Sequence, residues 1–293
     1  MPEVLRGWLA AGVPLGWWPL ALLLVGLAQC LLLWRCRLCL AWLGAAPPWR
    51  ALLLLYVQGW AFLLTPARSG EVVRVALLRR RCGIPHAVAL AGFLAERCTG
   101  LAAALLVLAL GVSGLRLWPM LLLAAALAFV FYGLTHPGSL AVVQRRLAGH
   151  PGRWRRWLTR SLAALVHLRA LLSPRQFLIG VGLALGAWLL EASLVWSLWQ
   201  VIGASPAAVG PGLLQAAVVR VSLGLGAVLS MLPAGIGVAD GTALGVALLY
   251  GIKLPLAITT LVVLRVCTIG LPLAVGGLAW LVPPVTTAQD PTP

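Results

Sequence analysis

The sequence predicts an all-α polytopic membrane protein with about five full spans and two re-entrant broken hairpins in an inverted internal repeat. Three observations lead to this fold class: the composition, the lengths of the apolar stretches, and the helix-breaking residues inside two of them. Hydrophobic residues make up 62% of the 293 residues, whereas only 10% are charged. A chain of this composition exposes apolar surface to lipid, so we expect a single transmembrane domain over residues 1–293.

Five apolar stretches are long enough to cross the hydrocarbon core of a bilayer, which requires roughly 20 helical residues. We expect full spans at 15–34, 88–111, 116–134, 176–202 and 256–282. The first of these lacks a small-residue cleavage site followed by a polar chain, so it is expected to be a retained span and not a signal peptide.

Two further apolar regions are interrupted. The first, 49–64, runs for about 16 residues, or roughly 24 Å of helix, and a second helical piece follows the break at 71–78. The second region, 213–232, is followed by a break and by a short apolar piece that ends at Tyr250. The residues expected to break the helices are Pro66 and Gly70 in the first region and Pro233, Gly235 and Gly237 in the second.

The basic residues indicate on which side each break lies, because Lys and Arg are enriched in cytoplasmic loops. The basic clusters at 35–50, 79–81 and 145–175 can all be cytoplasmic only if segment 49–78 enters the membrane and returns to the same side. The loop at 203–212 contains no Lys or Arg, which suits the outer side, so the second hairpin is expected to enter from outside. The N-terminus would then lie outside and the C-terminus inside.

An internal repeat relates the two halves of the chain. Matched residues recur 167–170 positions apart: Pro66 with Pro233, Glu71 with Asp240, Pro85 with Pro255, and Arg97 with Arg265. The expected units are 15–111 and 176–283, separated by the connecting span 116–134 and a basic loop at 135–175, with a disordered tail at 284–293. Inverted units with interrupted helices near the midplane are a recurrent transporter design. Chance similarity between Leu-, Ala- and Gly-rich segments is the alternative.

Four of the six acidic residues lie within apolar stretches: Glu71, Glu96, Glu191 and Asp240. An ionisable group in the hydrocarbon region costs roughly 2.5–3.5 kcal/mol on insertion scales, so it marks a functional site by default. Four arginines can compensate them: Arg74, Arg97, Arg220 and Arg265. We expect Arg74 and Arg97 to lie near Glu71. We expect Arg220 and Arg265 to lie near Asp240, because each would otherwise be an uncompensated buried charge.

These residues indicate a polar cavity that holds a phosphate-bearing headgroup. Broken helices leave free backbone amides and helix N-termini, which attract anions. An arginine fork binds a phosphate through two hydrogen bonds backed by a full charge. The alternative is that the ion pairs only orient the helices.

Other classes of partner are not favoured. The net charge of +16 comes from arginines in short loops between spans, which is typical of membrane topology and not of nucleic-acid binding. Cys36-x-x-Cys39 has no second pair, and the histidines lack metal-ligand spacing, so neither a metal nor another cofactor is expected. With no paired-Asp metal motif and no Ser/His dyad, we do not expect an enzyme.

Two blocks of the sequence carry a resemblance to a known family. Residues 66–74 read Pro-Ala-Arg-Ser-Gly-Glu-Val-Val-Arg, and a Glu-Arg pair follows at 96–97. Residues 232–241 read Leu-Pro-Ala-Gly-Ile-Gly-Val-Ala-Asp-Gly. In this order they resemble the lysylphosphatidylglycerol synthase transmembrane-region (flippase-like) family, whose blocks are Pro-Gly-x-x-Gly-Glu-x-x-Arg and Leu-Pro-x-Gly-x-Gly-x-x-Glu-Gly. Ala67 replaces a glycine of that pattern, and Asp240 replaces its glutamate.

The resemblance implies a multi-pass protein of the bacterial inner (cytoplasmic) membrane that moves a lipid with a phosphate or glycosyl-phosphate headgroup between leaflets. It does not imply aminoacyl transfer, because this chain contains no soluble synthase domain. Membrane lipids, anionic or with a phosphate headgroup, are the expected partners, and a homo-oligomer or a partner in envelope synthesis is left open. Two alternatives remain: an intramembrane enzyme acting on polyprenyl-phosphate or glycolipid, and a non-transporting scaffold subunit of a cell-envelope synthase.

Overall fold

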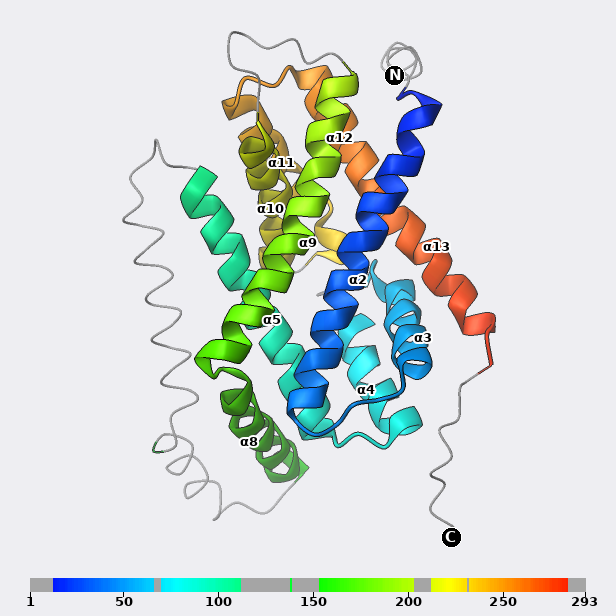
Figure 1. The fold of residues 1–293 in the computed structure, drawn as a ribbon, viewed down its shortest axis with the longest axis vertical. Helices are drawn as coiled ribbons and strands as arrows, with labels where there is room; N and C mark the ends of the chain where they lie inside the picture. The colour runs from blue at the N-terminus through cyan, green and yellow to red at the C-terminus, as the bar shows by residue number, and fades with distance from the viewer. Residues whose placement is uncertain are drawn as a thin grey trace.

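The computed structural model describes residues 13–65, 70–111, 153–202, 212–230 and 232–283, together with Gly138. Over these ranges every regular element is helical (Figure 1). Four helices there are long and apolar enough to span a membrane: Leu15–Trp42, His86–Gly111, Pro174–Val201 and Leu254–Leu281. The fifth expected span, 116–134, and the tail at 284–293 lie outside the described residues.

The four long helices begin where the sequence supplies a proline or a turn. The first is the 3-10 turn η1 (Leu15–Trp17) followed by α2 (Trp18–Trp42), the second is α5 (His86–Gly111), and the third is α9 (Pro174–Val201). The fourth runs through α12 (Leu254–Arg265), a π-helix η5 (Val266–Gly270), α13 (Leu271–Leu278) and the 3-10 turn η6 (Ala279–Leu281). Prolines occupy the first turns of α2, α9 and α12, where the missing N–H has no intrahelical partner to lose.

The predicted end of the first span at residue 34 is wrong, because α2 continues to Trp42. Two arginines mark the predicted end, but neither ends the helix. The side chain of Arg37 lies 4.1 Å from the centre of the Trp49 ring and donates a hydrogen bond to the Pro47 carbonyl at 3.2 Å. Arg35 turns inward and is buried. Each side chain thus meets a partner or the protein interior while the backbone stays helical.

The first interrupted region forms an antiparallel helix pair. It comprises α3 (Trp49–Gly59), the 3-10 turn η2 (Trp60–Phe62) and α4 (Gly70–Cys82). Both arms lie at the end of the molecule where α2 ends and α5 begins (Figure 1). The arms touch through Gly59 and Gly70, since a Cβ on Gly70 would overlap the Gly59 carbonyl oxygen. The predicted interruption is therefore present as two short helices packed against each other, and Pro66 lies outside the described residues.

The second interrupted region forms a matching pair at the opposite end of the molecule (Figure 1). It comprises α10 (Leu213–Leu229), the 3-10 turn η4 (Pro233–Gly235) and α11 (Val238–Leu249), and its two arms pack against each other. At the break, Gly235 and Gly237 have φ of 69° and 90°. Glycine adopts this left-handed region without the steric cost that a Cβ imposes. The predicted break at 233–237 is confirmed.

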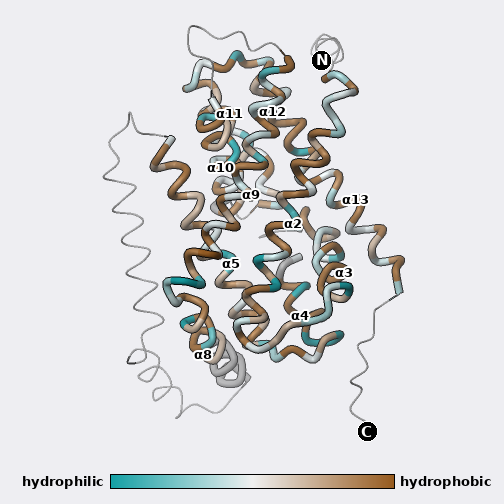
Figure 2. Tube along the Cα trace, in the orientation of Figure 1, coloured by the Kyte–Doolittle hydropathy of each residue, from teal (hydrophilic) through white to brown (hydrophobic). Residues whose placement is uncertain are grey.

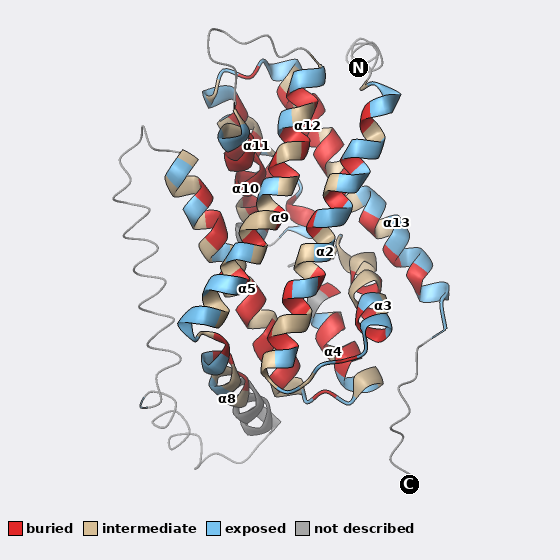
Figure 3. Cartoon of the chain, in the orientation of Figure 1, coloured by how far each residue is buried: buried red, intermediate tan, exposed pale blue. Residues whose placement is uncertain are grey.

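The outer surface of the long helices is apolar. Leu23 of α2 is 58% exposed, Leu178 of α9 67% and Leu278 of α13 64%. Figure 2 shows apolar residues recurring along these helices, and Figure 3 shows exposed residues recurring along them as well. Such an apolar surface is a liability in water but is suited to lipid. The protein is a multi-pass membrane protein.

One helix is polar. Helix α8 (Arg153–Leu171) lies beside the end of α5 that is nearest the first hairpin (Figure 1). It carries arginines along its first turns and at its last turn. A basic helix in this place fits the predicted basic segment, because cationic side chains at a helix that borders a membrane can meet anionic lipid headgroups.

Candidate functional site

A cavity of about 320 Å³ lies between the long helices and the two hairpins. Residues of both hairpins and of all four long helices line it. Its described charged residues are Arg35 from α2, Arg74 from α4, Glu96 and Arg97 from α5, Glu191 from α9 and Arg220 from α10. Five of these six residues were predicted as site residues, and the fold brings them together from segments far apart in the sequence.

The first ion pair in the cavity joins the first hairpin to α5. Arg74 Nη2 donates to Glu96 Oε2 at 2.7 Å, and each side chain is 6% exposed. The guanidinium of Arg74 also lies 5.2 Å from the centre of the Tyr56 ring. The side chain of Glu71, the predicted partner of Arg74 and Arg97, lies outside the described part of the chain. Arg97 lines the cavity next to Glu96.

The second ion pair joins the second hairpin to α9. Arg220 Nη2 lies 2.7 Å from Glu191 Oε2, and the two side chains are 8% and 7% exposed. The guanidinium of Arg220 lies 5.0 Å from the centre of the Trp188 ring. The predicted pairing of Arg220 with Asp240 is therefore wrong: α10 turns Arg220 towards α9, where Glu191 supplies a buried carboxylate.

A third ion pair lies outside the lining of this cavity and holds the break of the second hairpin. Arg265 Nε donates to Asp240 Oδ1 at 2.7 Å, and Arg265 Nη1 donates to the Ala234 carbonyl at 2.8 Å. Asp240 Oδ2 accepts the Gly237 N–H at 3.0 Å, which caps the first turn of α11 as an acidic residue there commonly does. The predicted contact between Arg265 and Asp240 is confirmed, and its geometry is that of a structural clamp.

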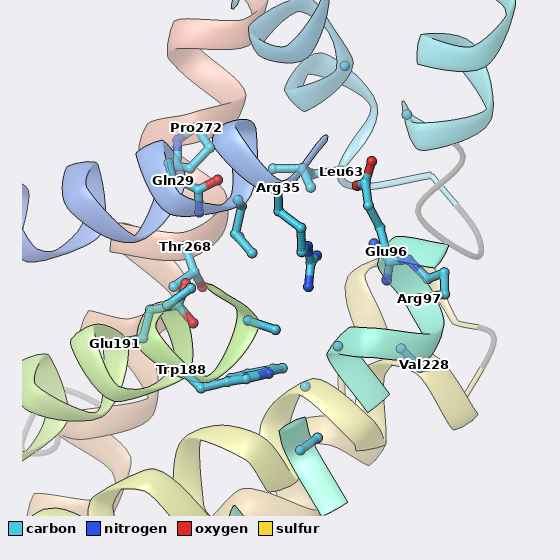
Figure 4. A pocket seen from close by; sticks show the side chains of 18 of the residues that line it. Gln29, Arg35, Leu63, Glu96, Arg97, Trp188, Glu191, Val228, Thr268 and Pro272 are labelled. Carbon is cyan, nitrogen blue, oxygen red and sulfur yellow. The ribbon is translucent and has the colours of Figure 1, made fainter. Parts of the chain in front are cut away.

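One cavity residue was missed by sequence reasoning. Arg35 is only 6% exposed, and Figure 4 shows it projecting from α2 into the middle of the cavity, between Glu96 on one side and Glu191 on the other. Its Nε and Nη1 atoms have no hydrogen-bond partner among the described residues. The sequence contains a signal for this: no turn residue follows Arg35 and mostly apolar residues continue at 38–43, which indicates that Arg35 lies within the helix and not in a loop.

Among the described lining residues, the charge balance favours an anion. The described lining contains four arginines against two carboxylates. Leaving a buried donor unsatisfied costs about 1–3 kcal/mol, and more for a charged group. An anion that accepts hydrogen bonds from Arg35 would recover this energy, and a phosphate oxygen pair fits the guanidinium fork.

The last span contributes an irregular backbone to the same cavity. Thr268 lies in the π-helix Val266–Gly270 and lines the cavity together with Pro272 of α13. A π-helix is rare and is often found at functional sites, and Pro272 has no N–H with which to continue the helical ladder. The backbone is therefore interrupted next to the cavity in this span as well as in the hairpins.

The model of the family described as lysylphosphatidylglycerol synthase TM region matches residues 3–276 of the chain. The chain belongs to this family. No curated protein and no solved structure matches it. Membership in the lysylphosphatidylglycerol synthase TM region family makes it a membrane protein related to lipid, and confirms the resemblance drawn from the two sequence blocks.

The two blocks of the lysylphosphatidylglycerol synthase TM region family map onto the two hairpins. In the first block, Arg74 and the Glu96 of the following Glu-Arg pair form the ion pair between α4 and α5. In the second block, Pro233 to Gly237 form the break, and Asp240 caps the helix that follows. Glu191 and Arg220 belong to neither block, yet the fold places them in the same cavity as Arg74 and Glu96.

Proposed function

We propose that the protein is a flippase of the bacterial inner membrane, which moves a lipid with a phosphate-bearing headgroup between the two leaflets. The observation that carries this proposal is the buried guanidinium of Arg35, whose Nε and Nη1 lack partners among the described residues while the side chain points into the cavity. A buried, unsatisfied cation in a cavity is a ready site for an anion.

The size and charge of the cavity support a headgroup and not a whole lipid as its content. A volume of about 320 Å³ is at the low end for ligand pockets, which span roughly 300–1,000 Å³. The ion pairs Arg74–Glu96 and Arg220–Glu191 neutralise two of the cavity's arginines. Of the other two lining arginines, Arg35 has two nitrogens without a hydrogen-bond partner among the described residues, so it would be the donor for a phosphate. The hydrocarbon chains would stay in an apolar environment.

The arrangement of the hairpins suggests how such a lipid would cross. We infer that the two hairpins are re-entrant and that the two halves of the chain form an inverted repeat, because the hairpins lie at opposite ends of the molecule (Figure 1). Each hairpin also supplies one arginine to a cavity ion pair with a long helix: Arg74 with α5 and Arg220 with α9. Opening one pair at a time would expose the cavity alternately to either side, as in other inverted-repeat transporters.

A reconstituted system tests this proposal. Purified protein in liposomes is given a fluorescent phosphatidylglycerol, and the rate of its exchange between leaflets is measured for wild type, Arg35→Gln and Arg37→Gln. Arg37 is the matched control, because it lies on the same helix but contacts Trp49 and Pro47 away from the cavity lining. Losing one charge-assisted hydrogen bond, worth about 1.5–3 kcal/mol, corresponds to a rate reduced roughly 10- to 100-fold.

We therefore expect Arg35→Gln to slow exchange by this factor and Arg37→Gln to exchange at close to the wild-type rate. Folding of each variant is checked by its elution and thermal unfolding in detergent. A folded Arg35→Gln protein that exchanges lipid as fast as wild type would refute the role of Arg35. Recovery of lipid with an altered headgroup would favour the intramembrane enzyme instead.

A further inference from the structure

A second cavity, of about 220 Å³, lies between α2, α3 and α13. Its lining is almost wholly apolar and includes Leu22, Val25 and Leu33 of α2, Leu53 of α3, and Leu271 and Val275 of α13. It adjoins the polar cavity, because four residues line both: Gln29, Tyr56, Trp60 and Pro272.

This apolar cavity also reaches the outer surface of the molecule. Leu22 and Leu53 on its rim are 48% and 50% exposed, and Leu271 and Val275 are 40% and 41% exposed. Gly26 and Cys30 of α2, which also line it, are exposed as well. A continuous apolar path therefore leads from the lipid-facing surface to residues that border the polar cavity.

Two of these four shared residues lie where the backbone departs from the α-helical form. Trp60 begins the 3-10 turn that ends the first arm of the first hairpin. Pro272 follows the π-helix Val266–Gly270 in the last span. Helices bend most readily at prolines and π-helical turns, so this is the place where α13 can move relative to α2.

We propose that the apolar cavity between α2, α3 and α13 holds a hydrocarbon chain of the lipid whose headgroup lies in the polar cavity, and that the lipid enters and leaves sideways at this point. This inference rests on the proposed function, since it assumes a lipid headgroup beside Arg35. A hydrocarbon chain fits because the lining is apolar, opens to the lipid-facing surface and adjoins the polar cavity. The shared residues Gln29 and Tyr56 lie where the polar and apolar parts of a lipid meet.

Glycine substitutions provide a matched test. A Cβ added to Gly26, which lines the apolar cavity, meets no atom within 4 Å, and the same is true of Gly182 on α9, which lines neither cavity. Gly26→Trp should fill the apolar cavity, whereas Gly182→Trp adds the same side chain to a lipid-facing position elsewhere. Both variants and wild type are reconstituted with a phosphatidylglycerol that carries a photoreactive diazirine in one acyl chain, and the labelled peptides are mapped.

The expected result is labelling of α2 and α13 in wild type and in Gly182→Trp, and loss of this labelling in Gly26→Trp. Lipid exchange should fall to the rate of protein-free liposomes in Gly26→Trp alone. Labelling of α2 and α13 that persists in Gly26→Trp, or labelling confined to other helices in wild type, would overturn the inference.

Wild-type protein offers a second route that does not depend on how Gly26→Trp folds. Cys30 is exposed and lines the apolar cavity, whereas the other free cysteines are buried or half-buried. A bulky maleimide on Cys30 should block exchange and acyl-chain labelling in folded wild type, and Cys30→Ala should be insensitive to the reagent. Unchanged labelling of α2 and α13 after complete modification of Cys30 would contradict the inference.

The two proposals fail in different ways. In one case, wild type exchanges no lipid, but the acyl chain labels its α2 and α13 and Gly26→Trp abolishes this labelling. The acyl-chain site is then supported and the transport proposal is refuted. If exchange depends on Arg35 but is unaffected by Gly26→Trp and by the Cys30 reagent, transport stands and the sideways route fails.

Discussion

The ion pair between Glu191 and Arg220 allows the energetic role of the cavity charges to be measured. The two side chains are 7% and 8% exposed, and their closest atoms are 2.7 Å apart. Replacing Glu191 by Leu leaves the guanidinium of Arg220 buried with no carboxylate partner among the described residues. Removing one partner of a buried pair costs about 3–5 kcal/mol, so we expect Glu191→Leu and Arg220→Met each to lower the free energy of unfolding by this amount.

The double variant Glu191→Leu, Arg220→Met behaves differently if the pair is real. Replacing both members of a buried ion pair by apolar residues of similar volume is often neutral or stabilising. We expect the double variant to unfold within about 1–2 kcal/mol of wild type, which gives a coupling energy of roughly 4 kcal/mol or more. The assay is denaturant-induced unfolding of all four proteins in the same mixed micelles.

A coupling energy near zero, with the two single effects adding in the double variant, would refute the pairing. Lipid exchange measured on the same proteins separates structure from function. The double variant should fold as well as wild type and yet exchange lipid poorly, because the pair can no longer open and close around the headgroup. A stable double variant that exchanges lipid at the wild-type rate would show that the pair only orients α9 and α10.

Three further predictions concern the hairpins. Gly276→Ala should destabilise the protein by about 1–3 kcal/mol through overpacking, because a Cβ there would lie 2.5 Å from the Ala61 backbone nitrogen. Gly277→Ala is the control: its Cβ would meet no atom within 4 Å, so it should be neutral or stabilising in the same unfolding assay. Asp240→Asn should lower the free energy of unfolding by only about 1 kcal/mol, since the carboxylate is 30% exposed and an amide oxygen can still cap the helix; a loss above about 3 kcal/mol would contradict this. Single cysteines at Arg80 and Lys253, in a background without the native cysteines, should react with an impermeant maleimide from opposite sides of the membrane; labelling from one side would refute the inverted topology.

The breaks of both hairpins could be predicted from the sequence because they depend on local chemistry. Pro233, Gly235 and Gly237 disrupt a helix wherever they occur, and the structure has the second break at these residues. The contact between Arg265 and Asp240 was also predictable, because both residues lie near that break. Features that depend on contacts within one hairpin and its neighbouring helix are therefore predicted well from the sequence.

The composition of the cavity could not be predicted in the same way, because it depends on how distant helices pack. Nothing local distinguishes Asp240 from Glu191 as a partner for Arg220, and only the packing of α10 on α9 decides between them. Arg35 and Arg37 are two residues apart on one helix, yet only Arg35 faces the interior. In the sequence, a cluster of arginines indicates a cytoplasmic loop. In the structure, the rotation of the helix about its axis decides which arginine faces the cavity.

The arginines of the cavity are proposed to select a lipid by its phosphate. The most direct measurement compares wild-type exchange of two fluorescent lipids with identical acyl chains, phosphatidylglycerol and an uncharged glycosyl-diacylglycerol, in the same liposomes. We predict that the protein accelerates exchange of the phosphate-bearing lipid well above that of protein-free liposomes and leaves the uncharged lipid at the protein-free rate. Equal acceleration of both lipids, or no acceleration of either, would contradict selection by the phosphate.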